Sequence, residues 1–150
     1  MNFFRITAIL ILTLFTTLAG AADGLIALKS PRDTKSTMDR LEDLAKQRGL
    51  FVFARIDHAA GAAKVGKTLR PTEVLIFGNP QGGTPFIECA QTIGIDLPLK
   101  MLVWEDSSGQ VWVGYNDAAY VAKRHEVPLC PASSNIGKAL AGLAESTVSQ

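Results

Sequence analysis

Histidine and cysteine are scarce in this sequence, whose 150 residues include two of each. A catalytic zinc site takes three protein ligands and a structural site takes four. His58 and His125 lie far apart, and neither an H-x-x-x-H nor a C-x-x-C spacing occurs. The sequence therefore predicts no metal site, and it identifies no cofactor.

An excess of charge of one sign is also lacking. Lysine and arginine together number 15 and aspartate and glutamate 14, which gives a formal net charge of +1. A chain so close to neutral has no strong overall field to attract nucleic acid or an anionic membrane. No basic run occurs, and basic residues do not alternate with aromatic ones. We therefore expect no nucleic-acid partner, and no membrane association once the N-terminal segment is removed.

The chain begins with the pattern of a secretory signal peptide. MNFFR carries one arginine, ITAILILTLFTTLAG is apolar and uncharged, and Ala19-Gly20-Ala21 offers the small residues of a cleavage site. We expect residues 1–21 to be a signal peptide and residues 22–150 to be one domain, secreted into the periplasm. The alternative is a retained anchor, because 6–22 reaches the lower limit of the roughly 17–25 residues that span a bilayer. The small residues at its end favour cleavage.

Export would place Cys89 and Cys130 in an oxidising compartment, where disulfides persist. An even number of cysteines favours pairing. A bond between them would close a loop of about 42 residues, which stabilises a fold by roughly 4 kcal/mol in the chain-entropy model. We predict one structural disulfide, with two separate buried thiols as the alternative. A catalytic redox pair is disfavoured because such pairs usually have C-x-x-C spacing.

Hydrophobic periodicity predicts an alternation of strands and helices. Strands are expected over residues 25–29, 50–57, 74–78, 99–106 and 111–116. Helices are expected between the first two strands, over residues 85–93, and from Ser133 or Ser134 toward the C-terminus. This order predicts an α+β fold in which helices pack on one face of a mostly antiparallel sheet.

Several short motifs in the middle of the chain resemble one known family. They are Ile56-Asp57-His58, Val65-Gly66, Leu69-Arg70-Pro71-Thr72, Phe77-Gly78-Asn79-Pro80, Gly83-Thr84-Pro85, Asp96-Leu97-Pro98-Leu99 and Tyr115-Asn116. In this order they resemble the domain-of-unknown-function family number 302 over residues 49–124, and more weakly over most of the mature chain. The resemblance implies a compact fold of the β-α-β4-α type, a tendency to form homodimers, and no established activity.

Polar side chains fall at the ends of the predicted strands. The candidate ligand-binding residues are His58, Arg70, Asn79, Asp96 and Tyr115. Rigid scaffolds commonly present binding groups at such positions. The leading interpretation is a non-catalytic module that dimerises and binds a small ligand or a partner in a cleft at the strand ends.

A small enzyme is the alternative. Asp57 and His58 precede a run of small residues that leaves room beside the imidazole, a group that titrates near neutrality and suits acid–base catalysis. Arg70 would clamp an anion. In the structural interpretation of the same residues, Asp57 caps a turn, His58 hydrogen-bonds a neighbouring strand, and Arg70 forms a salt bridge with Glu73 or Asp96. Catalysis requires these groups to converge in one water-excluded cleft.

Three further features have structural explanations. The glycine-rich segment 78–84 lacks the Gly-Lys-Ser/Thr ending of a P-loop, so we expect a plain strand-to-helix turn there. Trp104 and Trp112 are expected to pack across two strands, in the core or in a dimer interface. His125 is expected near a helix C-terminus, where a cation is favourable.

Overall fold

The computed structural model describes residues 22–150, so the predicted signal peptide at residues 1–21 lies outside the described part of the chain. The described residues form a five-stranded sheet in the order β1-β5-β4-β3-β2, with every neighbouring pair antiparallel. The strands are β1 (Leu25–Ser30), β2 (Phe51–Asp57), β3 (Thr72–Gly78), β4 (Leu99–Glu105) and β5 (Val111–Asn116). The predicted α+β fold with an antiparallel sheet is confirmed.

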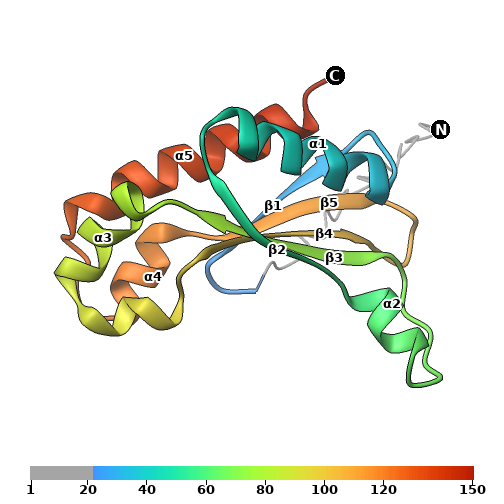
Figure 1. Cartoon of the computed structure of the whole chain (residues 1–150), viewed down its shortest axis with the longest axis horizontal. Coiled ribbons are helices and arrows are strands. Elements are labelled where there is room, and N and C mark those ends of the chain that lie inside the picture. Colours follow the sequence, from blue (N-terminus) through green and yellow to red (C-terminus); the bar gives the residue numbers. More distant parts are fainter. Residues whose placement is uncertain (1–21) are drawn as a thin grey trace, which may run out of the picture.

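Two long helices cover one face of the sheet, and shorter helices extend from its two ends (Figure 1). The α-helices are α1 (Thr34–Gln47), α2 (His58–Ala63), α3 (Pro80–Cys89), α4 (Ala118–Arg124) and α5 (Pro131–Val148), and a short 3-10 helix is η1 (Gln91–Ile95). α1 and α5 lie side by side above the sheet, α2 projects from one end, and α3 and α4 lie at the other (Figure 1).

The core lies between the sheet and the pair α1 and α5. Successive strand residues point to opposite faces. Leu75 and Val113 face the helices and are fully buried, whereas their neighbours Val74 and Trp112 are only half-buried. No helix of residues 22–150 covers this second side, which we call the open face. Its central residues are Val74, Ile76, Leu102, Trp104, Trp112 and Gly114.

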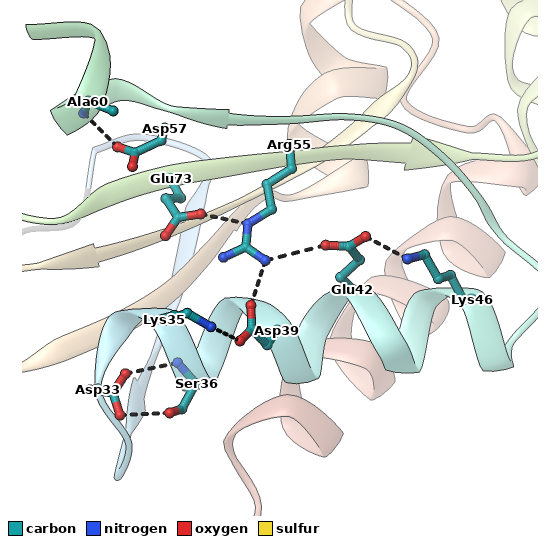
Figure 2. Close-up of polar contacts among 10 residues, drawn as sticks. All are labelled: Asp33, Lys35, Ser36, Asp39, Glu42, Lys46, Arg55, Asp57, Ala60 and Glu73. Atoms are coloured by element: carbon teal, nitrogen blue, oxygen red, sulfur yellow. Dashed lines mark hydrogen bonds and ion pairs between the residues drawn. The ribbon is translucent and has the colours of Figure 1, made fainter.

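Arg55 joins the sheet to α1 (Figure 2). Its Nε donates to Glu73 on β3 and its Nη1 to Asp39 on α1, both at 2.6 Å, and Nη1 also reaches Glu42 at 3.4 Å. The hydrogen bond to Glu73 raises the pKa of Arg55, and hydrogen bonds from Lys35 and Arg55 lower the pKa of Asp39. These groups remain partly exposed, so solvent screens their attraction and the network mainly orients α1 on the sheet edge.

Two helices begin earlier than the sequence predicts. Asn79 caps α3 through its side-chain oxygen, and Pro80 takes the first helical position, where a missing N–H costs nothing. The extended backbone of Ala90 then separates α3 from η1. Proline again sets the start of α5, at Pro131 rather than at Ser133.

A disulfide joins the end of α3 to the start of α5. The Cα atoms of Cys89 and Cys130 are 6.0 Å apart, within the usual range for a disulfide. The predicted cysteine pairing is therefore confirmed. The segment between the two cysteines includes η1, β4, β5 and α4, so the bond closes a loop that contains all four elements.

Candidate functional site

The antiparallel order of the strands divides the predicted site residues between two ends of the sheet. Neighbouring strands run in opposite directions, so consecutive strand ends do not meet. The end from which α2 projects carries Asp57, His58 and Arg70. The end beside α3 and α4 carries Asn79, Asp96 and Tyr115. The structure therefore does not bring all of these residues into one cleft.

At the α2 end, Asp57 serves the backbone. Its carboxylate accepts a hydrogen bond from the amide of Ala60 at 2.8 Å and caps α2, as the structural interpretation expects (Figure 2). His58 is the first residue of α2 and its side chain is exposed. The pair therefore lies on the surface, and a ligand there would remain in contact with water.

Arg70 lies at the same end and also contacts the backbone. Its Nε donates to the carbonyl oxygen of Glu105 at 3.2 Å. The carboxylates considered as its salt-bridge partners, Glu73 and Asp96, are paired with other arginines. Arg70 thus keeps an exposed guanidinium without an ion-pair partner among the described residues.

Asp96 is the centre of a polar chain that the sequence analysis did not identify. Its carboxylate accepts hydrogen bonds from Nε2 of His125 at 2.6 Å and from Nη1 of Arg124 at 2.8 Å. The other ring nitrogen of His125 lies 2.9 Å from the hydroxyl of Thr92. The side chains of His125 and Asp96 are only 8% and 14% exposed. The chain of contacts fastens η1, whose C-cap is Asp96, to the end of α4.

The order hydroxyl, imidazole and carboxylate is also that of a catalytic triad. However, neither Thr92 nor His125 lines the large cleft between α3 and α5 or the smaller cavity beside α4. Asp96 borders the smaller one, which holds about 30 Å³. Sequence spacing carries no signal for the pairing of Asp96 with His125, because the two residues are 29 positions apart. The sequence analysis explained His125 by its position at a helix end alone.

The larger cavity is a cleft of about 800 Å³ between α3 and the first half of α5, beside the starts of β2 and β4. Its wall is mostly apolar and includes Leu50, Phe53, Ile87, Leu97, Leu99 and Ile136. None of its lining residues is acidic, basic or a histidine. Cys89 of the disulfide is part of the lining, so the covalent link between α3 and α5 lies within the cleft wall.

Uncharged polar groups occur along the cleft at Gln81, Thr84 and Asn135. Their side chains form no hydrogen bond with other residues of the 22–150 region. They are therefore free to donate to and accept from a bound molecule. Such a lining, apolar with a few polar groups, is typical of small-molecule sites.

The glycine-rich start of α3 makes room for the cleft. Gly82 and Gly83 present no side chain there, and a Cβ atom on Gly83 would approach Leu97 at 3.6 Å. Asn79 is the one predicted ligand-binding residue in the lining of this cleft. Its oxygen is engaged by the cap of α3. The expected strand-to-helix turn thus forms, and it also shapes the cavity.

Tyr115 is placed in the core rather than on a surface. Its side chain faces the helices and is 5% exposed. Burial raises the pKa of its hydroxyl, with smaller contributions from the negative charges of Asp117 and Glu145. Tyr115 does not line the large cleft, so a ligand bound there would not contact it.

No three histidine, cysteine, aspartate or glutamate side chains of residues 22–150 gather as metal ligands. Over the same residues, no helix combines the length and the apolar character needed to cross a membrane.

Curated relatives match a large part of the chain. "Fluoride-specific ion channel FluC 1" of Brucella suis biovar 1 (strain 1330) is 47% identical over 106 residues, which are 71% of this chain and 42% of that protein. The protein of the same name from Brucella abortus biovar 1 (strain 9-941) is also 47% identical over 106 residues, 39% of its length. The chain thus spans about two-fifths of these relatives.

A solved structure has the same fold. It is the crystal structure of an uncharacterized conserved DUF302 protein from Bacillus stearothermophilus, with a TM-score of 0.76 and 22% sequence identity. The similarity covers 84% of this chain and 99% of that one. Residues 26–144 also match the family described as domain of unknown function DUF302. The chain therefore belongs to the DUF302 family.

Proposed function

We propose that this protein is an exported, non-catalytic module that binds an uncharged, largely apolar small molecule and works as a homodimer. The observation that carries the binding proposal is the cleft between α3 and α5. Its volume of about 800 Å³ falls within the range of roughly 300–1,000 Å³ that ligand sites occupy.

The lining of the cleft supports an uncharged ligand. A charged group loses hydration on entering an apolar cavity and needs an opposite charge in return. No lining residue supplies one. Gln81, Thr84 and Asn135 offer unpaired amide and hydroxyl groups that would orient a polar end of the ligand. The cleft also lacks the carboxylates and imidazoles on which acid–base catalysis depends, which favours binding over reaction.

Export is supported by the sequence of residues 1–21 and by the disulfide. Structural disulfides are rare in the cytosol and persist in oxidising compartments. Because Cys89 lines the cleft and Cys130 precedes α5, the bond holds together the two helices that form its walls. In the periplasm this disulfide would stay oxidised and would keep the two walls of the cleft linked.

Dimerisation is supported by the open face of the sheet. Trp104 and Trp112 stack there with ring centroids 6.3 Å apart, and both are only half-buried. Leu102 and Ile76 extend the apolar surface toward β3. Lys29, whose ammonium lies 5.4 Å from the centre of the Trp112 ring, and Lys100, opposite Ile76, border this surface. An apolar centre with a polar rim is typical of an interaction site. A second copy of the chain would cover it and leave the cleft free, because α3 and α5 do not contribute to that face.

The binding proposal is tested with Nile red, an uncharged apolar dye whose fluorescence rises in such sites. Phenylalanine in place of Ala139, on the cleft side of α5, should fill the space and weaken dye binding at least about tenfold. Lys138→Phe is the matched control, since the neighbouring residue does not line the cleft. Equal dye affinity in the two variants would contradict the proposal.

The enzyme alternative predicts a different result. His58 and Arg70 lie at the other end of the sheet, so His58→Ala should leave the affinity for Nile red unchanged. Anilinonaphthalene sulfonate, an anionic dye, should bind the cleft more weakly than Nile red. If His58→Ala abolished binding while Ala139→Phe did not, the ligand site would belong to the α2 end and the Asp57–His58 alternative would be favoured.

A further inference from the structure

The segment of residues 58–71, which we call the α2 arm, projects from the end of the sheet (Figure 1). It consists of α2 and the chain that returns to β3. None of the residues of α2 is buried. A tight turn at Gly66, with φ at +71°, forms its tip, and the amide of Lys67 donates there to the carbonyl of Ala62 at 2.9 Å. The arm thus contributes little to the core.

The arm concentrates positive charge. It contains Lys64, Lys67 and Arg70 and no aspartate or glutamate. No carboxylate of residues 22–150 forms an ion pair with any of these three. The acidic residues that border the arm are engaged elsewhere, Asp57 in the cap of α2 and Glu73 with Arg55. The positive charges are therefore exposed and unneutralised by the protein.

Large apolar side chains are exposed between these cations. Val65 at the tip is 73% exposed, and Leu69 on the returning chain is 53% exposed. Because these aliphatic side chains are not buried, they contribute little to the stability of the fold. Lysine side chains next to them are able to extend along an apolar layer while their ammonium groups stay in water.

We propose that the α2 arm docks on the surface of a lipid bilayer that contains anionic phospholipids. Such a surface offers phosphate groups to Lys64, Lys67 and Arg70 and an apolar boundary to Val65 and Leu69, a combination that basic, apolar segments bind. An acidic protein surface would satisfy the cations and leave the two aliphatic side chains without an apolar partner.

The near-zero net charge of the chain predicted no membrane association. The net charge sums over all charges of the chain, but a membrane interacts most strongly with the charges nearest to it. At about 0.1 M salt, charges are screened beyond roughly 10 Å. A bilayer that the tip approaches therefore attracts mainly the cations of the tip itself. Because the arm and the cleft lie at opposite ends of the sheet, docking would hold the cleft away from the bilayer.

Vesicle co-sedimentation tests the proposal with the processed protein purified from the cell envelope. Phosphatidylglycerol-containing vesicles should bind more protein than pure phosphatidylcholine vesicles. The double variant K64Q/K67Q should lose about fivefold in affinity for each lysine removed. The matched control K123Q/K138Q removes two exposed lysines of α4 and α5 and should retain the affinity of the unchanged protein.

A second variant tests the apolar part. Val65→Ser keeps every charge, so it should weaken binding by a similar factor at low and high salt, whereas the loss caused by K64Q/K67Q should shrink as salt screens the cations. Equal binding to both kinds of vesicle would overturn the proposal, as would equal losses for K64Q/K67Q and K123Q/K138Q. Binding to neither vesicle would also overturn it and would point to an acidic protein as the partner. The cleft experiment with Nile red is independent of all these outcomes.

Discussion

Asp96 accepts a hydrogen bond from Nε2 of His125 at 2.6 Å, although the two residues are 29 positions apart in the chain. A carboxylate has no proton to donate, so the imidazole is the donor. Asp96→Ala leaves a nearly buried imidazole without its acceptor, and we expect a loss of about 1–3 kcal/mol in the free energy of unfolding. Urea denaturation measures it.

Arg124→Gln provides the control for that change. Arg124 shares the same carboxylate but its side chain is 55% exposed, so its removal should cost less than about 1 kcal/mol. Similar losses for the two variants would show that His125 does not depend on Asp96. His125→Ala removes the same hydrogen bond but leaves the Asp96 carboxylate paired with Arg124.

The disulfide should account for a large part of the stability. Replacing Cys89 and Cys130 together by serine opens a loop that spans 41 residues and should lower the free energy of unfolding by roughly 4 kcal/mol. Denaturation of the unchanged protein in the presence of a reductant should give the same midpoint as this variant. A midpoint that does not move with reductant would mean that the thiols are not linked in solution.

Asp106 should make the protein less stable in acid. Its carboxylate accepts hydrogen bonds from Ser108 and from Nε1 of Trp112, and the bond from the Ser108 hydroxyl contributes most to lowering its pKa. A lowered folded-state pKa gives stability that is present above about pH 4 and is lost as the pH falls through the folded value. Asp106→Asn should flatten the decline of the urea midpoint below pH 4.

Asp23→Asn is the control, because the exposed Asp23 carboxylate forms no hydrogen bond within residues 22–150. Its midpoint should follow the same pH dependence as the unchanged protein. If Asp106→Asn also followed it, the hydrogen bonds around Asp106 would not persist in solution.

The open face should form the dimer interface. Leu102→Lys places a charge in the centre of that face and should convert a dimer into a monomer in sedimentation velocity, because a buried unpaired charge is costly. Ala119→Lys adds the same charge on the exposed surface of α4 and should leave the dimer intact. Dimers in both variants would place the interface on another surface.

Local patterns in the sequence predict much of the fold. The periodicity of apolar residues marks all five strands, and Met38, Leu41 and Ala45 recur at helical spacing and are buried in α1. These signals depend on near neighbours in the chain, which is why they are visible without the structure. The pairing of Cys89 with Cys130 was predictable for another reason, since only two cysteines occur.

The sequence by itself therefore determined the order of the five strands, the α+β class and the disulfide, whereas it did not predict helix α4 or the break between α3 and η1. Tertiary structure alone decided which strand ends meet, because antiparallel pairing sends Asp57 and Asn79 to opposite ends of the sheet. It also created the cleft between α3 and α5 and brought Asp96 to His125. These relations join residues far apart in the chain, and packing rather than local spacing sets the distances between them.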